Sequence, residues 1–325
     1  MATRKIRLPS PNTVAASSTS LISCPVGPAY RYGVIHLQLG VVQSGGGAST
    51  RLPTGSGTTA GYVNDIRVKV NGKVQRLHTA AECAKLNAMN GTLFVTNTYG
   101  TSAASKEYGQ VLSIWFREPW RKSLKQQEAL CLPTGSQVGV RTLEVEVDFG
   151  ALSANEASFV CKAFAEVDGN QPDEIHANGV VMSKVFRQNI TGGTAAGSAV
   201  DITTLDRRDL YTTVVAELGG TAQPGTVANG LNVATIGSYT GQLKISANGV
   251  DVFDLPKDVA YLAHQASGLN PQQFDLEAVL DSTDDIRSGL TADGLSDLRV
   301  RIDLVADTAD GAGWKLITER TGLID

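Results

Sequence analysis

The chain has 325 residues, which is enough for two domains with sizeable cores. Its 28 Lys and Arg against 32 Asp and Glu give a net charge of −4, which argues against a chain that binds nucleic acid over its whole surface. Charged residues make up only 18% and glycine is abundant, with 34 residues, so short strands with many turns are favoured over a helical bundle. Uncharged stretches are broken by Pro, Gly, Ser and Thr, unlike a membrane span of about 20 apolar residues.

The four cysteines, Cys24, Cys83, Cys131 and Cys161, lie far apart and form no CxxC pair. This spacing predicts reduced thiols in a protein that is made in a cytoplasm.

Charge is distributed unevenly along the chain. Residues 1–165 hold 17 Lys and Arg against 9 Asp and Glu, whereas residues 166–325 hold 11 against 23. Two interpretations remain open. The halves are two domains with different solvated faces, or the basic half of one copy docks on the acidic half of another.

The N-terminus is basic, because Arg4, Lys5 and Arg7 precede a run rich in Ser, Thr and Pro. A Lys or Arg next to an anionic membrane surface contributes about 1 kcal/mol of attraction. We therefore consider a basic N-terminal arm that faces lipid headgroups or phosphates, with a plain solvated arm as the alternative.

Three segments of the first half recur in the second half in the same order. The paired segments are residues 30–40 and 209–219, residues 66–87 and 243–264, and residues 143–148 and 298–303. Such a repeat predicts two copies of one all-β unit, separated by residues 166–174, whose Gly, Pro and acidic residues are typical of a linker. We expect an N-terminal domain of residues 1–168 and a C-terminal domain of residues 169–325.

Within the second matched pair, Asn71-Gly72 and Asn248-Gly249 fall in register. Asn-Gly between two alternating runs is a strong hairpin signal, because a type I′ turn needs positive φ at both central residues. Both halves therefore contain a predicted hairpin at the same place.

A short helix is expected after each hairpin. Thr79 and Glu82 have the spacing of a capping box, and Asn90-Gly91 offers a stop for the first helix. In the second copy, Pro256 offers a first-turn residue.

Each copy thus combines several short strands, glycine-rich turns and one or two short helices. This pattern fits an eight-stranded jelly roll better than a hairpin meander. The predicted fold class is all-β, with two tandem eight-stranded jelly rolls (a double jelly roll) and a few short helices. Residues 45–61 and 219–230 follow the first matched strand of each copy, and we expect them to be exposed, mobile loops.

The histidines give no sign of a metal site. His36, His78, His176 and His264 are scattered and form no His-x-His pair, so we expect isolated core or surface histidines rather than a cupin centre. Neither GK[ST] nor GxSxG occurs. We predict no catalytic residue and no cofactor.

Several carboxylates of the second half could offer oxygen ligands, although they lack the spacing of an EF-hand loop. They are Asp281, Asp284, Asp285, Asp307 and Asp310. A structural calcium ion and solvated turn carboxylates remain the two alternatives.

Two segments, DIRVKVNGKVQR (residues 65–76) and SIWFREPWRKSL (residues 113–124), carry a family resemblance, and LEVEVD (residues 143–148) follows them. The chain resembles the N-terminal coat-protein domain of corticovirus-type major capsid proteins of lipid-containing icosahedral bacteriophages. The clear similarity covers about residues 60–150. The resemblance implies a double jelly roll that forms homotrimeric capsomers with a pseudo-hexagonal outline, which tile an icosahedral shell over an internal membrane.

The run that matches the family best consists of Trp115, Phe116, Pro119, Trp120 and Arg121. By its own pattern, this run continues a strand, after which Pro119 starts a helix with Trp120 and Leu124 on one face. Core packing is one interpretation of these side chains. A direct intersubunit anchor is the other, because aromatic residues and Arg are enriched at interfaces.

The leading functional hypothesis is therefore a structural major capsid protein, not an enzyme. Its expected partners are other copies of itself, neighbouring capsomers, vertex (penton) and minor capsid proteins and the internal viral membrane, without sequence-specific nucleic acid binding. We expect it in the virion capsid, after synthesis and assembly in the cytoplasm of a bacterial host. The alternative is a carbohydrate- or receptor-binding jelly-roll module, such as a spike or lectin, which the near absence of aromatic residues from the long loops disfavours.

Overall fold

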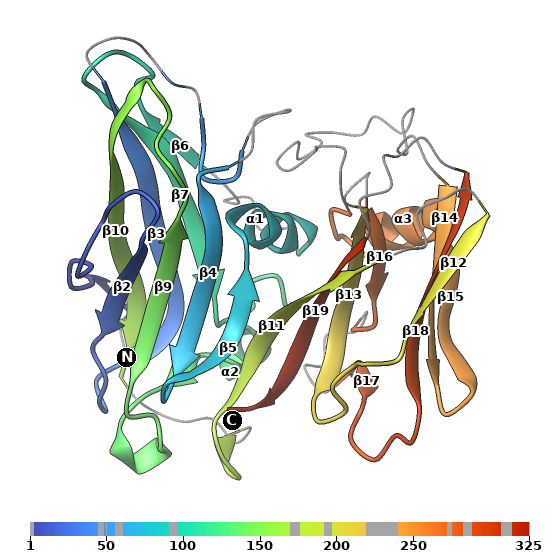
Figure 1. Cartoon of the computed structure of the whole chain (residues 1–325). Helices are drawn as coiled ribbons and strands as arrows, with labels where there is room; N and C mark the ends of the chain where they lie inside the picture. Colours follow the sequence, from blue (N-terminus) through green and yellow to red (C-terminus); the bar gives the residue numbers. More distant parts are fainter. Residues whose placement is uncertain are drawn as a thin grey trace. The chain divides into compact units, whose positions relative to one another are not determined.

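The computed structural model describes residues 3–44, 49, 51–55, 61–90, 97–169, 176–191, 197–218, 240–271, 275–281, 288–306 and 314–324. The chain divides into two compact units (Figure 1). Unit 1 comprises Met1–Asn87, Thr92–Met182 and Leu323–Asp325, and unit 2 comprises Ala88–Gly91 and Ser183–Gly322. This division lies beyond the boundary expected at residues 168 and 169, because Val180 and Met182 are buried in the core of unit 1.

Unit 1 contains two antiparallel sheets. The first has the strand order β1 (Arg4–Arg7), β10 (Glu156–Asp168), β3 (Arg31–Gln43), β7 (Glu107–Trp115) and β6 (Asn97–Gly100), and β8 (Leu132–Pro133) also pairs with β3. The second has the order β2 (Thr19–Cys24), β9 (Leu143–Phe149), β4 (Val63–Val70) and β5 (Lys73–His78). The helices are α1 (Ala80–Met89), α2 (Leu124–Ala129) and a 3-10 turn at Ser136–Val138.

Unit 2 repeats this plan. One sheet has the order β11 (Val181–Ile190), β19 (Trp314–Leu323), β13 (Leu210–Leu218) and β16 (Asp275–Val279), and β17 (Leu290–Thr291) also pairs with β13. The other has the order β12 (Ser198–Ile202), β18 (Leu298–Ala306), β14 (Thr240–Ala247) and β15 (Val250–Pro256). The helix α3 is Lys257–Ala266.

The connections show that each unit is an eight-stranded jelly roll. With the short β6, β8 and β17 set aside, the first, eighth, third and sixth strands of each unit form one sheet, and the second, seventh, fourth and fifth form the other. This is the double-sheet arrangement of a jelly roll. The three repeated segments coincide with equivalent elements: β3 and β13, β4-β5-α1 and β14-β15-α3, and β9 and β18. The predicted all-β fold of two tandem jelly rolls is confirmed.

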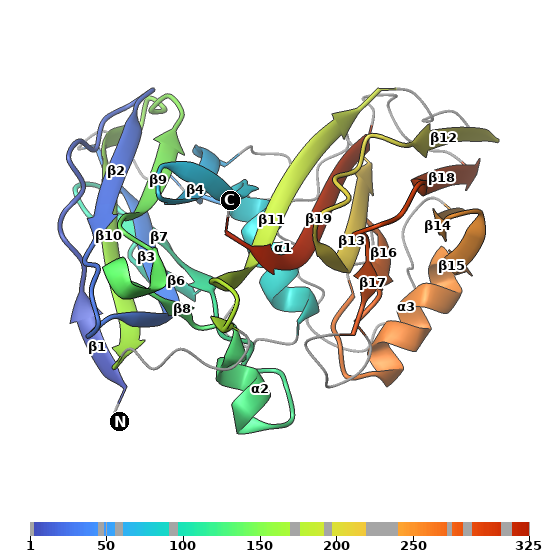
Figure 2. The ribbon, with the colours of Figure 1, turned by 90° about the horizontal axis from the view of Figure 1, so that it is seen from below.

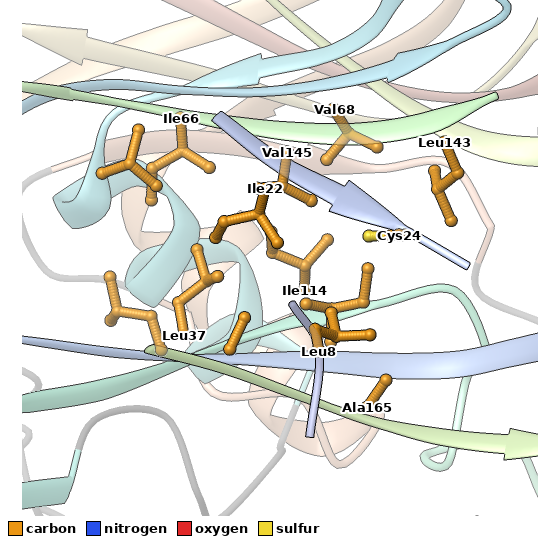
Figure 3. Packing of buried hydrophobic residues seen from close by; sticks show 14 of the residues in the cluster. Leu8, Ile22, Cys24, Leu37, Ile66, Val68, Ile114, Leu143, Val145 and Ala165 are labelled. Carbon is orange, nitrogen blue, oxygen red and sulfur yellow. The ribbon is translucent and has the colours of Figure 1, made fainter. Parts of the chain in front are cut away.

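The core of unit 1 lies between its two sheets. Along β9 buried and half-buried residues alternate, as expected for a strand with one face on the core. Figure 3 shows Ile22, Val145 and Val68 of the second sheet on one side of this core, with Leu37 and Ala165 of the first sheet on the other. Unit 2 has a separate apolar cluster, which includes Trp314, the largest fully buried side chain. Alternating apolar residues thus account for both cores.

The helices α1 and α3 test the helix starts that the sequence predicted. At α1 the capping box is confirmed, because the backbone N–H of Thr79 donates to Glu82 Oε2 (2.8 Å) and that of Glu82 donates to Thr79 Oγ1 (3.1 Å). At α3, Pro256 occupies the N-cap position, one residue before the first turn. No helix in the described residues is long and apolar enough to cross a membrane.

Candidate functional site

The residues that resemble the family run begin at the end of β7. Phe116 is buried, and its backbone N–H and that of Arg117 both donate to the Gly33 carbonyl, at 3.0 and 2.9 Å. Phe116 belongs to the core of unit 1. For this residue, core packing is therefore observed, as the first of the two interpretations of the family run expected.

Trp115 lies on the opposite side of the strand and is half-buried. Its ring meets His36 edge-on with the ring centroids 6.1 Å apart, and the Arg117 guanidinium lies 5.5 Å from its ring centroid. Arg117 also forms an ion pair with Glu166 at 2.5 Å. This aromatic and ionic contact fixes the outer face of the first sheet of unit 1.

Arg121 is held by a buried ion pair. Its Nε lies 2.9 Å from Glu118 Oε2, and both side chains are less than a tenth exposed. The Glu118 backbone N–H donates to the Gln127 carbonyl (2.8 Å), and Gln127 Nε2 donates to the Arg121 carbonyl (2.5 Å). The segment before α2 is therefore pinned to that helix.

The expected helix start at Pro119 is wrong. Pro119 and Trp120 lie in a turn, and α2 begins at Leu124, where Ser123 Oγ accepts a hydrogen bond from the Gln126 backbone N–H (3.3 Å). A proline φ suits a turn as well as a helix start, and the serine side chain supplies the cap. Leu124 is 76% exposed, so it shares no buried face with Trp120.

The Asn-Gly turn of unit 1 ties two parts of its second sheet together. Asn71 has φ 52° and Gly72 has φ 79°, as the type I′ turn requires. Asn71 Oδ1 accepts hydrogen bonds from the backbone N–H groups of Arg141 (2.8 Å) and Thr142 (3.3 Å). The turn therefore holds the segment that leads into β9.

The equivalent turn of unit 2 makes the same contact. Asn248 has φ 49° and Gly249 has φ 79°. Asn248 Oδ1 accepts hydrogen bonds from the backbone N–H groups of Ser296 (2.9 Å) and Asp297 (3.1 Å), just before β18. The sequence predicted the turn but not this side-chain role, although the matched positions of the two asparagines were a signal for it.

The basic N-terminal residues form a strand rather than an arm. In β1, Lys5 pairs with Glu166 of β10 and its Nζ lies 3.4 Å from that carboxylate, while the side chains of Arg4, Lys5 and Arg7 are exposed. The following Leu8 is buried in the core, which anchors the segment. In the described part of the chain, β1 pairs only with β10, so its outer edge is open.

Unit 2 contains a buried ionic cluster that no sequence motif indicated. Lys184 lies 3.3 Å from Asp209, and Arg320 lies 3.5 Å from Asp209 and 3.2 Å from Asp206. A hydrogen bond from Arg208, with the nearby Arg320 charge, holds the pKa of Asp206 well below its usual range. Opposite charges compensate one another here, so no member of the cluster is left as an uncompensated buried charge.

The described residues offer little metal or redox chemistry. Within the described residues, no group of three or more His, Cys, Asp or Glu could hold a metal ion. Asp281 is described, whereas Asp284, Asp285, Asp307 and Asp310 lie outside the described residues, so the structural calcium ion and the solvated turn carboxylates stay the two alternatives. Burial raises the pKa of the Cys24, Cys131 and Cys161 thiols to about 12, which makes them unreactive.

The two jelly rolls in sequence place the chain in the class of double jelly-roll proteins. The profile of the family described as "Viral coat protein P2 N-terminal domain" matches residues 5–168, about half of the chain. The chain therefore belongs to this viral coat protein family. Its role is structural rather than enzymatic, and its place is the virion capsid.

Solved structures support the same fold over the whole chain. The crystal structure of the major capsid protein P2 from bacteriophage PM2 is 18% identical, with a TM-score of 0.68, and the match covers 100% of this chain and 98% of that one. The crystal structure of the STIV MCP is 13% identical, with a TM-score of 0.67 and coverage of 99% and 97%. The PBCV-1 virus capsid is 10% identical, with a TM-score of 0.62 and coverage of 99% and 93%. No curated protein matches the chain in sequence.

Proposed function

We propose that this chain is the major capsid protein of an icosahedral, membrane-containing bacteriophage and that it forms homotrimeric capsomers. The duplication carries the proposal. Each chain holds two jelly rolls with the same strand order, so a ring of three copies presents six similar units in a pseudo-hexagonal outline.

The comparisons support the capsid part of the proposal. The similar solved structures include the major capsid protein P2 of bacteriophage PM2 and the PBCV-1 virus capsid, and the first matches nearly end to end. The family match adds a sequence relation to viral coat proteins.

The charge distribution supports a ring in which the basic half of one copy contacts the acidic half of the next. In a closed ring of three, a given patch of one copy contacts a different patch of the next. The basic residues 1–165 and the acidic residues 166–325 favour contacts between unlike halves and oppose contacts between like halves. Apolar burial supplies most of the affinity of such an obligate interface.

The proposed partners follow from this role. They are other copies of the chain, neighbouring capsomers, vertex (penton) and minor capsid proteins, and the internal membrane, without sequence-specific nucleic acid binding. Synthesis and assembly in the cytoplasm of a bacterial host are part of the same proposal. That Arg4, Lys5 and Arg7 face the membrane stays a prediction, and sedimentation with anionic lipid vesicles tests it.

The test is the particle that the purified chain forms. Light scattering after size exclusion is expected to give a mass of about 103 kDa, three times the chain's 34.2 kDa. Negative-stain images are expected to show particles with a hexagonal outline. A stable monomer at micromolar concentration would overturn the capsomer, and round single-unit particles would favour the receptor-binding alternative.

A further inference from the structure

Unit 2 exposes an unusual concentration of apolar side chains. Eight large hydrophobic residues are exposed in the described part of the chain, and four of them lie within residues 250–262. These are Val250 (65% exposed), Val252 (44%), Val259 (47%) and Leu262 (51%). Two lie on β15 and two on α3, and α3 packs against β14, β15 and β16 (Figure 2). Water contacts these side chains in the isolated chain, which is unfavourable.

The duplication shows that the same positions are covered in unit 1. With the offset of 177 residues that aligns the two Asn-Gly turns, Val252, Val259 and Leu262 correspond to three polar residues of β5 and α1. Those equivalents are Gln75 (0% exposed), Glu82 (1%) and Lys85 (9%). These three positions are thus polar and buried in the first copy, and apolar and exposed in the second, whereas Lys73, the equivalent of Val250, is exposed as well.

The strand edge beside these residues is also open. In the described part of the chain, β15 is the last strand of its sheet and pairs only with β14. An exposed edge that carries valines is a template for another chain, and proteins usually protect such edges with charges or cover them. Here Val252 lies at an irregularity between β14 and β15, next to the exposed Asp251.

The charges around this face are mainly acidic. Asp251, Asp254 and Asp258 are exposed. Of the two lysines nearby, Lys244 lies 2.7 Å from Asp251 and 3.4 Å from Asp254, and Lys257 is buried. These interactions leave an excess of negative charge at the rim of the apolar residues. A partner with a basic rim is favoured.

The chain itself offers such a partner surface. The open edge of β1 in unit 1 exposes Arg4, Lys5 and Arg7, with Glu166 as the one acidic neighbour that forms an ion pair with Lys5. We propose that Val252, Val259 and Leu262, here called the α3–β15 surface, dock a second copy of this chain, whose β1 edge lies against the acidic rim. This inference rests on the proposed trimer, names the contact that would hold it together, and is the alternative to a membrane-facing role of Arg4, Lys5 and Arg7.

Charged substitutions in the apolar centre test the surface. Val252→Asp and Leu262→Asp are each expected to raise the trimer dissociation constant at least about tenfold, as central interface positions do, and to shift the light-scattering mass toward 34.2 kDa. The matched control is Leu124→Asp, an exposed leucine on α2 of unit 1, which is expected to leave the mass unchanged. Circular dichroism of each variant checks that the fold is intact.

A cross-link tests the partner. A chain with Arg7→Cys and Asp254→Cys is expected to form disulfide-linked oligomers on oxidation, whereas Lys122→Cys with Asp254→Cys is expected to stay unlinked. The native cysteines are all buried and do not compete. In addition, Arg7→Asp and Asp254→Arg are each expected to weaken the trimer, and the chain that carries both is expected to recover because the ion pair is restored with reversed sign.

The outcomes separate the two proposals. A monomeric wild-type chain overturns the capsomer and this contact together. A wild-type trimer that Val252→Asp and Leu262→Asp leave unchanged overturns the contact alone. If Arg7→Asp lowers binding to phosphatidylglycerol vesicles while the trimer mass stays the same, the basic edge faces lipid and the proposed contact is wrong.

Discussion

At the scale of single residues, burial lowers the pKa of a histidine on α3. His264 is buried, its ring stacks against Phe253, and its Nε2 accepts a hydrogen bond from the Val279 backbone N–H (3.3 Å). Burial lowers the pKa of His264 from its ordinary value of 6.5, because the charged ring would lose its hydration. Burial also lowers the pKa of His36.

Stability is therefore expected to fall as the pH drops below about 6.5, because the unfolded chain then takes up protons that the folded chain resists. One such group contributes at most about 1.4 kcal/mol per pH unit to the slope. We expect the free energy of unfolding, measured with urea between pH 7.5 and 5, to depend less steeply on pH in His264→Gln than in the wild-type chain. Gln265→Ala on the same helix is the control, and an unchanged slope in His264→Gln would contradict the prediction.

At the scale of elements, the two hairpins are built from the same turn. An added Cβ at Gly72 or Gly249 would meet no atom within 4 Å, so only the positive φ opposes a side chain there. Asn71 and Asn248 extend each turn into a contact with the next strand of the sheet. The turns are therefore equivalent in conformation and in surroundings.

Gly72→Val and Gly249→Val are each expected to lower the free energy of unfolding by about 1 to 3 kcal/mol, the cost of left-handed backbone for a branched side chain. Denaturant unfolding of both variants measures this, and similar losses are expected. Gly72→Asn and Gly249→Asn are controls with smaller expected losses, because asparagine tolerates this conformation. Variants with unchanged melting temperature and soluble yield would show that the turns do not matter for stability.

At the scale of the whole molecule, the opposite charges of the two halves affect assembly. Charge complementarity accelerates encounter and selects the register, while apolar burial holds the formed complex. Salt acts on the first effect far more than on the second, because the Debye length is only about 3 Å at 1 M.

Trimer assembly from refolded monomer is therefore expected to be slower near 1 M salt than at low salt, whereas a formed trimer stays intact. Time-resolved light scattering at the two salt concentrations measures the assembly rate, and size exclusion in 1 M salt checks the formed particle. Assembly kinetics that are indifferent to salt would remove the electrostatic part of the proposal and leave the trimer itself in place.

The duplicated all-β plan was predictable from the sequence. Alternating strands, Asn-Gly turns and the Thr79–Glu82 capping box depend on neighbouring residues, so their physical cause is readable along the chain. The repeat then placed these elements in two equal jelly rolls, because a duplicated pattern implies a duplicated fold. The run around Trp115 and Phe116 indicated a coat protein only through its resemblance to the family.

The roles of residues that are far apart in sequence depend on tertiary contacts. The basic N-terminus became the edge strand β1 because β10, more than 150 residues away in sequence, supplied its partner. Pro119 entered a turn because the buried Glu118–Arg121 pair and Ser123 set the start of α2. The exposure of Val259 and Leu262 could likewise not be predicted from the sequence. The spacing of apolar residues along a helix indicates an apolar stripe, but it does not show whether another element covers that stripe. Burial depends on long-range packing, which local sequence does not specify.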